Sequence, residues 1–323
     1  MSAKRLLINA TLILGLLLAG YLLYKVFNRY SLDEVIQSIE AIPVSRLVAG
    51  IGFAALSYVC LTLFDWMGLR YAGKPLSYPR AAIASFTGLS IGHNLGVAAL
   101  SSGAVRYRYY ARWGLSVEEV AKVILFCGVT VGIGLSALAG IALLVNPQDA
   151  ANLLNLSARE LFLLGLACLG VPALYVVLAA TVRVPLRLWK WRFQMPTLTL
   201  AIGQVVIGTL NFIFVAACLH QMLVEQGDVG FVQTATAFVL ANIAILLTHV
   251  PGGLGVLEAT VSHVLPGAAS IGALVAFRVI YFVLPLLIGL PVFAVSEIVI
   301  RKRGKPASKD SADQPMNAQT QLL

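Results

Sequence analysis

Two glycine- and serine-rich stretches lie inside long apolar sequence, and charged residues accompany each of them. The first contains Asn94, Ser102 and Gly103 and leads into Arg106 and Arg108. Guanidinium groups bind phosphate oxygens through paired hydrogen bonds, so this stretch has the chemistry to hold a phosphate group. The alternative is that the arginines only anchor the cytoplasmic rim of a membrane protein, and the residue types alone do not separate the two.

The second stretch breaks an apolar segment with proline and glycine and ends at a carboxylate. Its members are His249, Pro251, Gly252, Gly253 and Glu258. In hydrocarbon, broken backbone persists only where protein or a water-filled cavity satisfies its freed N–H and C=O groups. We therefore expect this stretch to line an interior site in which the carboxylate needs a cation.

The cation proposed for Glu258 is Arg278, which lies similarly deep in the last apolar segment. We expect the two to meet in the interior, either within a binding site or only as a pair that fixes the packing. His249 is a candidate proton carrier if transport is coupled to protons, as is Glu258 itself. The alternative for His249, and equally for His93, is donation to a freed backbone carbonyl.

Two further carboxylates lie in apolar segments. Asp65 is a candidate proton or gating residue that Arg70 or an arginine of the first stretch would neutralise, with solvation at the membrane rim as the slightly favoured alternative. Glu297 lies within one helical turn of the basic C-terminal cluster and is expected to be a surface charge.

The composition identifies the class of protein that must position these residues. Hydrophobic residues make up 59% of the 323 and charged residues only 11%, with a mean hydropathy of +0.88. These values are typical of a polytopic membrane protein. The net charge of +9 comes from bases beside hydrophobic segments, which favours an anionic membrane surface over nucleic acid as the partner. The sequence contains neither a nucleotide-binding loop nor a hydrolase motif, and the spacing of its four cysteines suits no disulfide or metal, so we expect no cofactor.

Charge distribution predicts the topology. Eight apolar runs are long enough to cross a bilayer; they are roughly residues 6–27, 46–69, 81–101, 120–145, 160–182, 198–223, 232–250 and 271–299. If 81–105 and 232–265 are re-entrant hairpins and six helices span, then 17 of the 23 lysines and arginines fall on one side. This asymmetry places both termini in the cytoplasm. Eight spanning helices remain the alternative.

The resulting order contains a repeat. Span, span, hairpin, span occurs twice within one transmembrane domain, residues 1–300, so halves of about 1–146 and 157–300 would be inverted copies. Inverted repeats with interrupted helices are typical of secondary transporters, whose sites lie where those helices meet. The tail, residues 301–323, begins with bases and then has the composition of a disordered segment.

Three motifs also resemble a known family. They are Ser102-Gly103-Ala104-Val105-Arg106-Tyr107-Arg108-Tyr109-Tyr110, then His249-Val250-Pro251-Gly252-Gly253-Leu254-Gly255-Val256-Leu257-Glu258-Ala259, then Arg278-Val279-Ile280-Tyr281. In this order they resemble the transmembrane region of the bacterial lysylphosphatidylglycerol synthase/flippases, the multiple peptide resistance factors, and of related stand-alone inner-membrane proteins. The resemblance covers about residues 5–300 and departs at Ser101-Ser102, where relatives often carry a glycine pair.

The resemblance implies a flippase that moves an anionic or aminoacylated phospholipid across the bacterial inner membrane, with a homodimer possible. The soluble aminoacyl-transferase domain of the two-part enzymes has no counterpart in this sequence, so enzyme activity is not implied. Arg106, Arg108, Glu258 and Arg278 become the favoured lipid-site residues. Tyr281 of the third motif is a further candidate for lipid binding. The alternatives are a transporter of a small polar solute and a non-transporting, lipid-binding partner of a lipid enzyme.

Overall fold

A computed structural model describes most of the chain from residue 42 to residue 303. The described residues are 42–303 without 96–97, 146, 148–150, 152–155, 183–185, 189–190, 226, 249–252 and 267–268, together with residues 33, 36, 37 and 40. The spanning helix expected at 6–27 and residues 304–323 of the expected tail lie outside this part of the chain.

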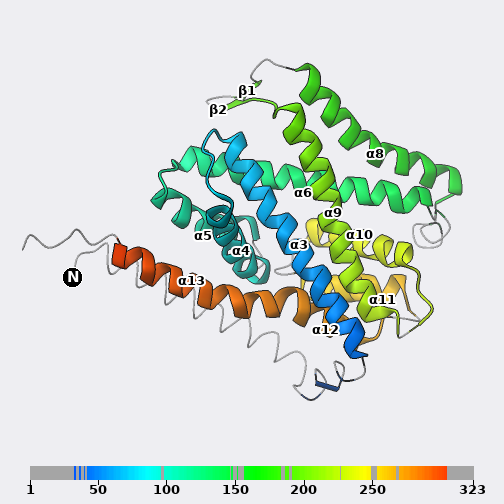
Figure 1. Ribbon diagram of the computed structural model, residues 1–323. Helices are drawn as coiled ribbons and strands as arrows, with labels where there is room; N and C mark the ends of the chain where they lie inside the picture. The colour runs from blue at the N-terminus through cyan, green and yellow to red at the C-terminus, as the bar shows by residue number, and fades with distance from the viewer. Residues whose placement is uncertain are drawn as a thin grey trace, which may run out of the picture.

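Four helices form the first half of the described chain. They are α3 (Val44–Tyr71), α4 (Tyr78–Leu95), α5 (Ala98–Arg112) and α6 (Val117–Val145). Helices α4 and α5 pack against each other as a helical hairpin (Figure 1). The chain turns between α5 and α6 at Gly114, whose φ of 91° is a left-handed conformation that favours glycine.

The second half contains more helical segments because its last long run is interrupted. Its elements are α8 (Ala158–Thr181), α9 (Leu198–Leu223), α10 (Phe231–Thr248), α11 (Val256–Val264), α12 (Ile271–Arg278), η2 (Val279–Val283) and α13 (Leu284–Arg303). Helix α8 begins with a capping box, in which Ser157 and Glu160 satisfy each other's backbone N–H groups. Helices α10 and α11 pack together as a second hairpin, α11 being the short arm.

A short β-hairpin connects α8 to α9 where only an interfacial, partly amphipathic stretch was expected. Strands β1 (Leu186–Leu188) and β2 (Trp191–Phe193) pair antiparallel, with Arg187 opposite Arg192. Each strand reads apolar, Arg, apolar, and an alternation of period two is typical of strands.

Six helices of the described part are long and apolar enough to cross a membrane. They are Val44–Tyr71, Val117–Val145, Ala158–Thr181, Leu198–Leu223, Phe231–Thr248 and Gly272–Ile298. The protein is therefore an all-α, multi-pass membrane protein, apart from the β-hairpin, as predicted. Five of the six correspond to expected spans, and the sixth is α10, the first arm of the expected second hairpin. Re-entry of the two hairpins stays a prediction.

Helices α3 and α9 lie side by side and run in opposite directions (Figure 1). Near the start of α3, Arg46 Nε lies 2.8 Å from Glu225 Oε1, just beyond the end of α9. Near its end, the Tyr71 hydroxyl donates to the Gln194 carbonyl just before α9 begins, at 2.8 Å. These helices occupy equivalent positions in the two predicted halves, and an inverted repeat requires such opposite directions.

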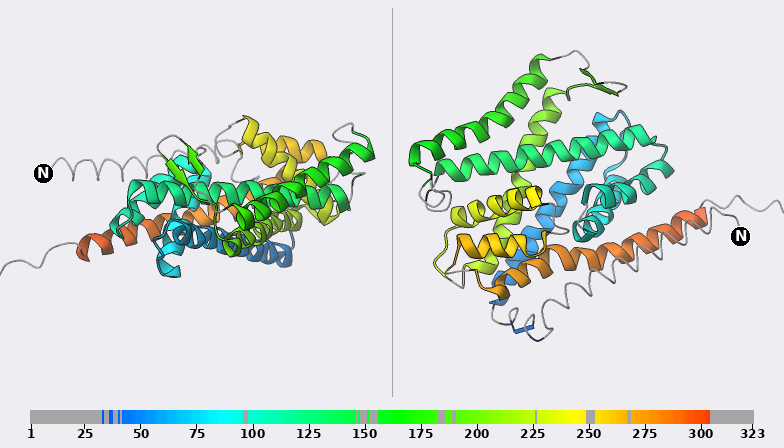
Figure 2. Two further views of the ribbon diagram at one scale, coloured as in Figure 1. Left: turned by 90° about the horizontal axis from the view of Figure 1, so that it is seen from above. Right: turned by 180° about the vertical axis from the view of Figure 1, so that it is seen from behind.

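Close helix packing holds the centre together while apolar side chains cover the outside. Gly134 of α6 lies against Gly208 of α9, so the two backbones touch. Figure 2 shows a flat bundle with α8 and α13 at opposite edges. Helix α8 is the least buried of the candidate spans and exposes Phe162, Leu163 and Leu174. Such exposure suits hydrocarbon and not water.

Candidate functional site

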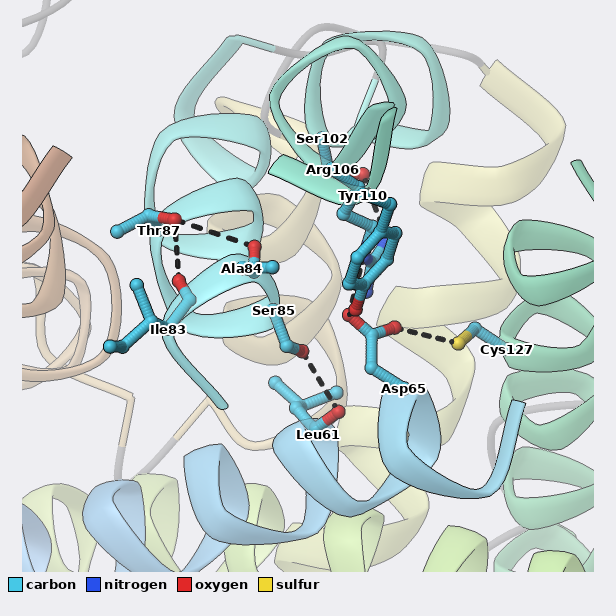
Figure 3. Close-up of polar contacts among 10 residues, drawn as sticks. All are labelled: Leu61, Asp65, Ile83, Ala84, Ser85, Thr87, Ser102, Arg106, Tyr110 and Cys127. Atoms are coloured by element: carbon cyan, nitrogen blue, oxygen red, sulfur yellow. Dashed lines mark hydrogen bonds and ion pairs between the residues drawn. The ribbon is translucent and has the colours of Figure 1, made fainter. Parts of the chain in front are cut away.

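A buried ion pair joins the first hairpin to α3. Arg106 of α5 donates from Nε to Asp65 Oδ2 at 2.8 Å, and the two side chains are 5% and 0% exposed. Figure 3 shows two more donors on the same carboxylate, the Tyr110 hydroxyl at 3.0 Å and the Cys127 thiol at 3.0 Å. Solvation of Asp65 at the rim, the favoured expectation, was wrong, because helices on three sides exclude water from it.

Helix α5, which carries Arg106, lies close to both α4 and α6 because small residues occupy these contacts. A Cβ on Gly88 of α4 would lie 3.2 Å from Arg106 Cγ and 3.2 Å from the Ser102 carbonyl oxygen. The Arg106 Nη1 group also donates to Ser102 Oγ at 3.3 Å. Ser102 therefore contributes a side-chain contact to the ion pair, while Gly103, which is also buried, lets Ile124 of α6 approach α5.

A second buried carboxylate accepts hydrogen bonds from the other two arginines of α5. Glu297 of α13 accepts from Arg108 at 2.8 and 2.6 Å and from Arg112 at 2.6 and 3.0 Å. Its side chain is only 3% exposed, so the expectation of a surface charge was wrong. The two arginines are one helical turn apart and project toward the same oxygens, which sequence proximity to the C-terminal cluster did not reveal.

The predicted contact between Glu258 and Arg278 is present. Arg278 donates from Nε to Glu258 Oε1 and from Nη2 to Oε2, the latter at 3.0 Å. Both residues also bind backbone of the same loop, since Arg278 Nη2 reaches the Gly253 carbonyl at 2.8 Å and the Gly255 N–H reaches Glu258 Oε2 at 2.9 Å. The pair therefore closes the turn between α10 and α11 and ties it to the last helix.

The last helix contains a π-helical turn directly after Arg278. Within η2 the Leu284 N–H bonds to the Val279 carbonyl, five residues earlier, so neighbouring carbonyls lose their usual partners. Asn94 of the first hairpin donates to the Phe282 carbonyl at 3.2 Å, and the Tyr58 hydroxyl lies 3.4 Å from the Tyr281 carbonyl. Asn94 thus connects the first hairpin to a broken helix.

An interior cavity of about 250 Å³ lies between the two hairpins and η2. From the first hairpin His93 reaches it, and from the second Asn242, Gly253 and Leu257. Tyr281 and Phe282 of η2 close a further side, and the remaining walls, such as Leu61, Phe212 and Phe277, are mostly apolar. A mostly apolar cavity with a few converging polar groups is the usual form of a small-ligand site.

Polar side chains from three helices meet at one wall of this cavity. Ser57 Oγ donates to Asn211 Oδ1 at 2.8 Å and lies 2.8 Å from the Tyr281 hydroxyl. His93 of the first hairpin stacks on Tyr281, with ring centroids 6.4 Å apart, and its buried Nδ1 atom has no hydrogen-bond partner among the described residues. Donation from Nδ1 to a freed carbonyl is therefore not what the structure shows.

The structure brings the predicted residues into neighbouring clusters and not into one. Tyr281 and Gly253 line the cavity, Asn94, Glu258 and Arg278 support its walls, and Arg106 and Arg108 bind carboxylates away from it. His249, Pro251 and Gly252 lie outside the described residues. Their roles, like those of the other candidates, stay predictions.

Sequence reasoning missed Ser57 and Asn211. The signal that pointed to them was weak, an uncharged polar residue inside an apolar run, and hydrophobic spans tolerate several of these. Only the crossing of α3 and α9 brings the two within hydrogen-bonding distance. Among the described residues, no group of three or more His, Cys, Asp or Glu side chains could hold a metal ion.

The sequence is similar to known membrane proteins over most of its length. The family model described as the lysylphosphatidylglycerol synthase TM region matches residues 12–289. An uncharacterised Synechocystis protein, slr0712, is 28% identical over 263 residues, which are 80% of this chain and 82% of that protein. The inner membrane protein YbhN of Escherichia coli is 26% identical over 263 residues, 79% of this chain and 81% of its own length. The chain therefore belongs to the family of the lysylphosphatidylglycerol synthase transmembrane region.

Proposed function

We propose that this protein is a flippase that moves a phospholipid, anionic or aminoacylated, between the leaflets of the bacterial inner membrane. The head group would cross through the cavity between the two hairpins while the acyl chains remain in the surrounding hydrocarbon. Family membership and the similarity to an inner membrane protein support a role connected with membrane lipids. The finer statement, that the protein transports them, is ours.

The observation that carries the proposal is the position of the cavity. It is bordered by the first hairpin at His93, by the second hairpin at Asn242 and by the π-turn at Tyr281. Interrupted helices are unfavourable in hydrocarbon unless protein or a water-filled cavity satisfies the freed backbone groups. In transporters such helices flank the substrate site. Here three interruptions surround one interior space.

Two arginines of the first hairpin bind carboxylates, one of which a lipid phosphate can replace. Arg106 and Arg108 each bind a carboxylate, Asp65 and Glu297 respectively. A phosphate oxygen can replace a carboxylate oxygen on a guanidinium group because both are anionic acceptors of the same fork geometry. We propose that a lipid phosphate passing the first hairpin competes with Glu297 for Arg108, whose side chain is 17% exposed, whereas the buried Arg106 keeps Asp65.

Liposome reconstitution tests the proposal. Purified protein is placed in vesicles with phospholipids that carry a fluorophore on one acyl chain, and a membrane-impermeant quencher reports the outer-leaflet fraction over time. We expect lipid exchange at least tenfold faster than in protein-free vesicles. Exchange no faster than in those vesicles, for several head groups and with or without a proton gradient, would reject the flippase.

A matched pair of variants separates passage through the cavity from general leakage. Val215 lies on the cavity wall and is 4% exposed, whereas Val206 of the same helix faces outward and is 50% exposed. Val215→Phe fills the cavity and should reduce exchange about tenfold, while Val206→Phe should leave it unchanged. Equal rates in the two variants would show that lipid moves elsewhere.

The orientation is part of the proposal. Both termini are expected on the cytoplasmic side because basic residues concentrate in the segments that the predicted topology places there. Fusion of a reporter that is active only outside the cytoplasm to the C-terminus should give no signal, whereas a fluorescent protein that folds only inside should be bright. The reverse pattern would invert the topology.

A further inference from the structure

The part of the chain that the structure describes contributes no Lys, Arg, Asp or Glu side chain to the lining of the cavity. The charged groups closest in the fold have partners already: Arg278 binds Glu258, Arg106 binds Asp65, and Arg108 and Arg112 bind Glu297. A charged ligand group placed in this cavity would lose hydration without gaining a counter-ion from these residues, which is unfavourable.

The donor and acceptor roles in the hydrogen-bond chain at the polar wall are fixed. The side-chain amide oxygen of Asn211, Oδ1, can only accept a hydrogen bond, so Ser57 must donate its single hydroxyl proton to it. The Tyr281 hydroxyl must then donate to Ser57 Oγ. This order fixes Asn211 Oδ1 toward Ser57. The amide nitrogen of Asn211 is left as a donor, and it has no other partner in the described chain.

A second amide of the cavity supplies an acceptor. Asn242 uses its amide nitrogen on the Phe238 carbonyl at 2.8 Å, so its Oδ1 remains as an acceptor, again without a described partner. The cavity thus offers a donor and an acceptor, neither of them charged, beside the aromatic side chains of Phe212 and Phe277.

We infer that the cavity binds an uncharged, hydroxyl-bearing group, such as the polyol end of a phospholipid head, and that it excludes head groups ending in an ammonium or a bare phosphate. A hydroxyl both donates and accepts, so two neighbouring hydroxyls match the Asn211 donor and the Asn242 acceptor, while aromatic faces pack against the carbon–hydrogen side of the polyol. This inference rests on the proposed function and narrows its substrate class to the anionic alternative, because an aminoacylated head group ends in an ammonium and would be excluded.

Binding tests the inference separately from transport. The purified full-length protein in detergent is titrated with short-chain phospholipids that share identical acyl chains: phosphatidylglycerol, phosphatidic acid and phosphatidylethanolamine. The shift in melting temperature reports apparent affinity. We expect phosphatidylglycerol to bind about tenfold more tightly than the other two, as the loss of one or two buried hydrogen bonds predicts. Equal affinities, or tighter binding of either other lipid, would overturn the inference.

A change of charge should reverse the preference. Asn211→Asp places a carboxylate on the polar wall, and the apparent affinity for phosphatidylethanolamine should then rise to at least that for phosphatidylglycerol. Asn242→Leu, on the less buried wall, is the second variant and should reduce only phosphatidylglycerol binding, about fivefold. Thr209→Val is the control, because the Thr209 hydroxyl bonds only to the Val205 carbonyl of its own helix. An unchanged order in both test variants would reject the assignment.

Two further arms identify the source of the polyol and the fate of the lipid. The deacylated, water-soluble head group glycerophosphoglycerol competes for binding if the site takes a free solute; binding as tight as that of the lipid would assign the site to a solute. In liposomes, selective binding of phosphatidylglycerol without lipid exchange would retain the polyol site and reject the flippase. Exchange of all three lipids at one rate, without selective binding, would retain the flippase and reject the polyol site.

Discussion

Asp65 of α3 and Arg106 of α5 form an ion pair with an Nε–Oδ2 distance of 2.8 Å, and both side chains are almost fully buried. Tyr110 and Cys127 complete the coordination of the carboxylate, so three helices meet at one charge. In an interior of low dielectric constant such a pair is unfavourable to break, because the partner left behind keeps its charge without compensation. The first hairpin is therefore fixed to the bundle at this point.

Removal of the charge from Asp65 should destabilise the protein strongly. Asp65→Asn leaves the Arg106 guanidinium buried without a counter-ion, at a cost of about 3 to 5 kcal/mol in the free energy of unfolding. Tyr110→Phe removes one hydrogen bond and should cost only about 1 kcal/mol. Chemical denaturation in detergent measures both. A similar loss in the two variants would mean that the charge is not the dominant contribution.

The double variant Asp65→Asn with Arg106→Gln should recover part of that loss, since no buried charge remains. An amide pair keeps the hydrogen bonds at lower desolvation cost. Recovery of at least half of the lost unfolding free energy is the expected result. If the double variant is as unstable as the sum of the two singles, the residues do not act as a pair.

Glu297 should stabilise the contact between α5 and α13. Glu297→Gln removes the negative charge shared by Arg108 and Arg112 and turns one acceptor oxygen into an NH2 donor, so we expect a loss of about 2 to 4 kcal/mol. The control is Glu118→Gln, which removes an exposed pair with Lys122 one turn apart and should change stability by less than about 0.5 kcal/mol. Thermal unfolding in detergent compares them.

Exchange of the charges at Glu258 and Arg278 should not restore the protein. Each residue binds the loop backbone as well as its partner, because Glu258 accepts from the Gly255 N–H and Arg278 donates to the Gly253 carbonyl. Glu258→Arg with Arg278→Glu would place a donor against a donor and an acceptor against an acceptor. We expect both single reversals and the double to lose lipid exchange in vesicles. Full recovery in the double reversal would reduce the site to simple charge pairing.

The contact between α6 and α9 depends on a glycine of each helix, Gly134 and Gly208, at the point where the two backbones touch. A Cβ on Gly134 would overlap the Gly208 backbone, and a Cβ on Gly208 would lie 2.8 Å from the Thr130 carbonyl oxygen. Gly134→Ala should therefore separate the helices and cost about 2 to 3 kcal/mol. Gly128→Ala, on the same helix with nothing within 4 Å, should be neutral or stabilising by up to about 1 kcal/mol. Equal melting temperatures for the two variants would contradict this account.

Composition and periodicity were sufficient for much of the fold. Long apolar runs predicted helices, and five expected spans reappear among the candidate spans of the structure. The sequence also predicted that Glu258 and Arg278 would meet, because two buried charges of opposite sign without local partners have few other stable arrangements. The β-hairpin was missed since three residues per strand give too short a pattern to distinguish from a loop.

The charged pairs of the first hairpin show where sequence reasoning ended. Arg106 and Arg108 were expected either to hold a phosphate or to anchor the membrane rim. Asp65, if not solvated at the rim, was expected to pair with Arg70 or with an unspecified arginine of the first hairpin, because apolar segments give no sign of which distant carboxylate will face which arginine. The carboxylate partners of Arg106 and Arg108 are 41 and 189 residues away along the chain. Such pairings depend on how helices cross, and crossing angles follow from side-chain packing that no local pattern encodes.

The sequence by itself determined a membrane-embedded helical protein with two interrupted segments and buried charges, because desolvation acts on each residue whatever its neighbours. Tertiary structure alone decided which charges neutralise one another and where an uncharged cavity remains. Ser57 and Asn211 lie 154 residues apart and meet only where α3 crosses α9. The polar wall, and with it the proposed selectivity, is therefore a property of packed helices and not of any single motif.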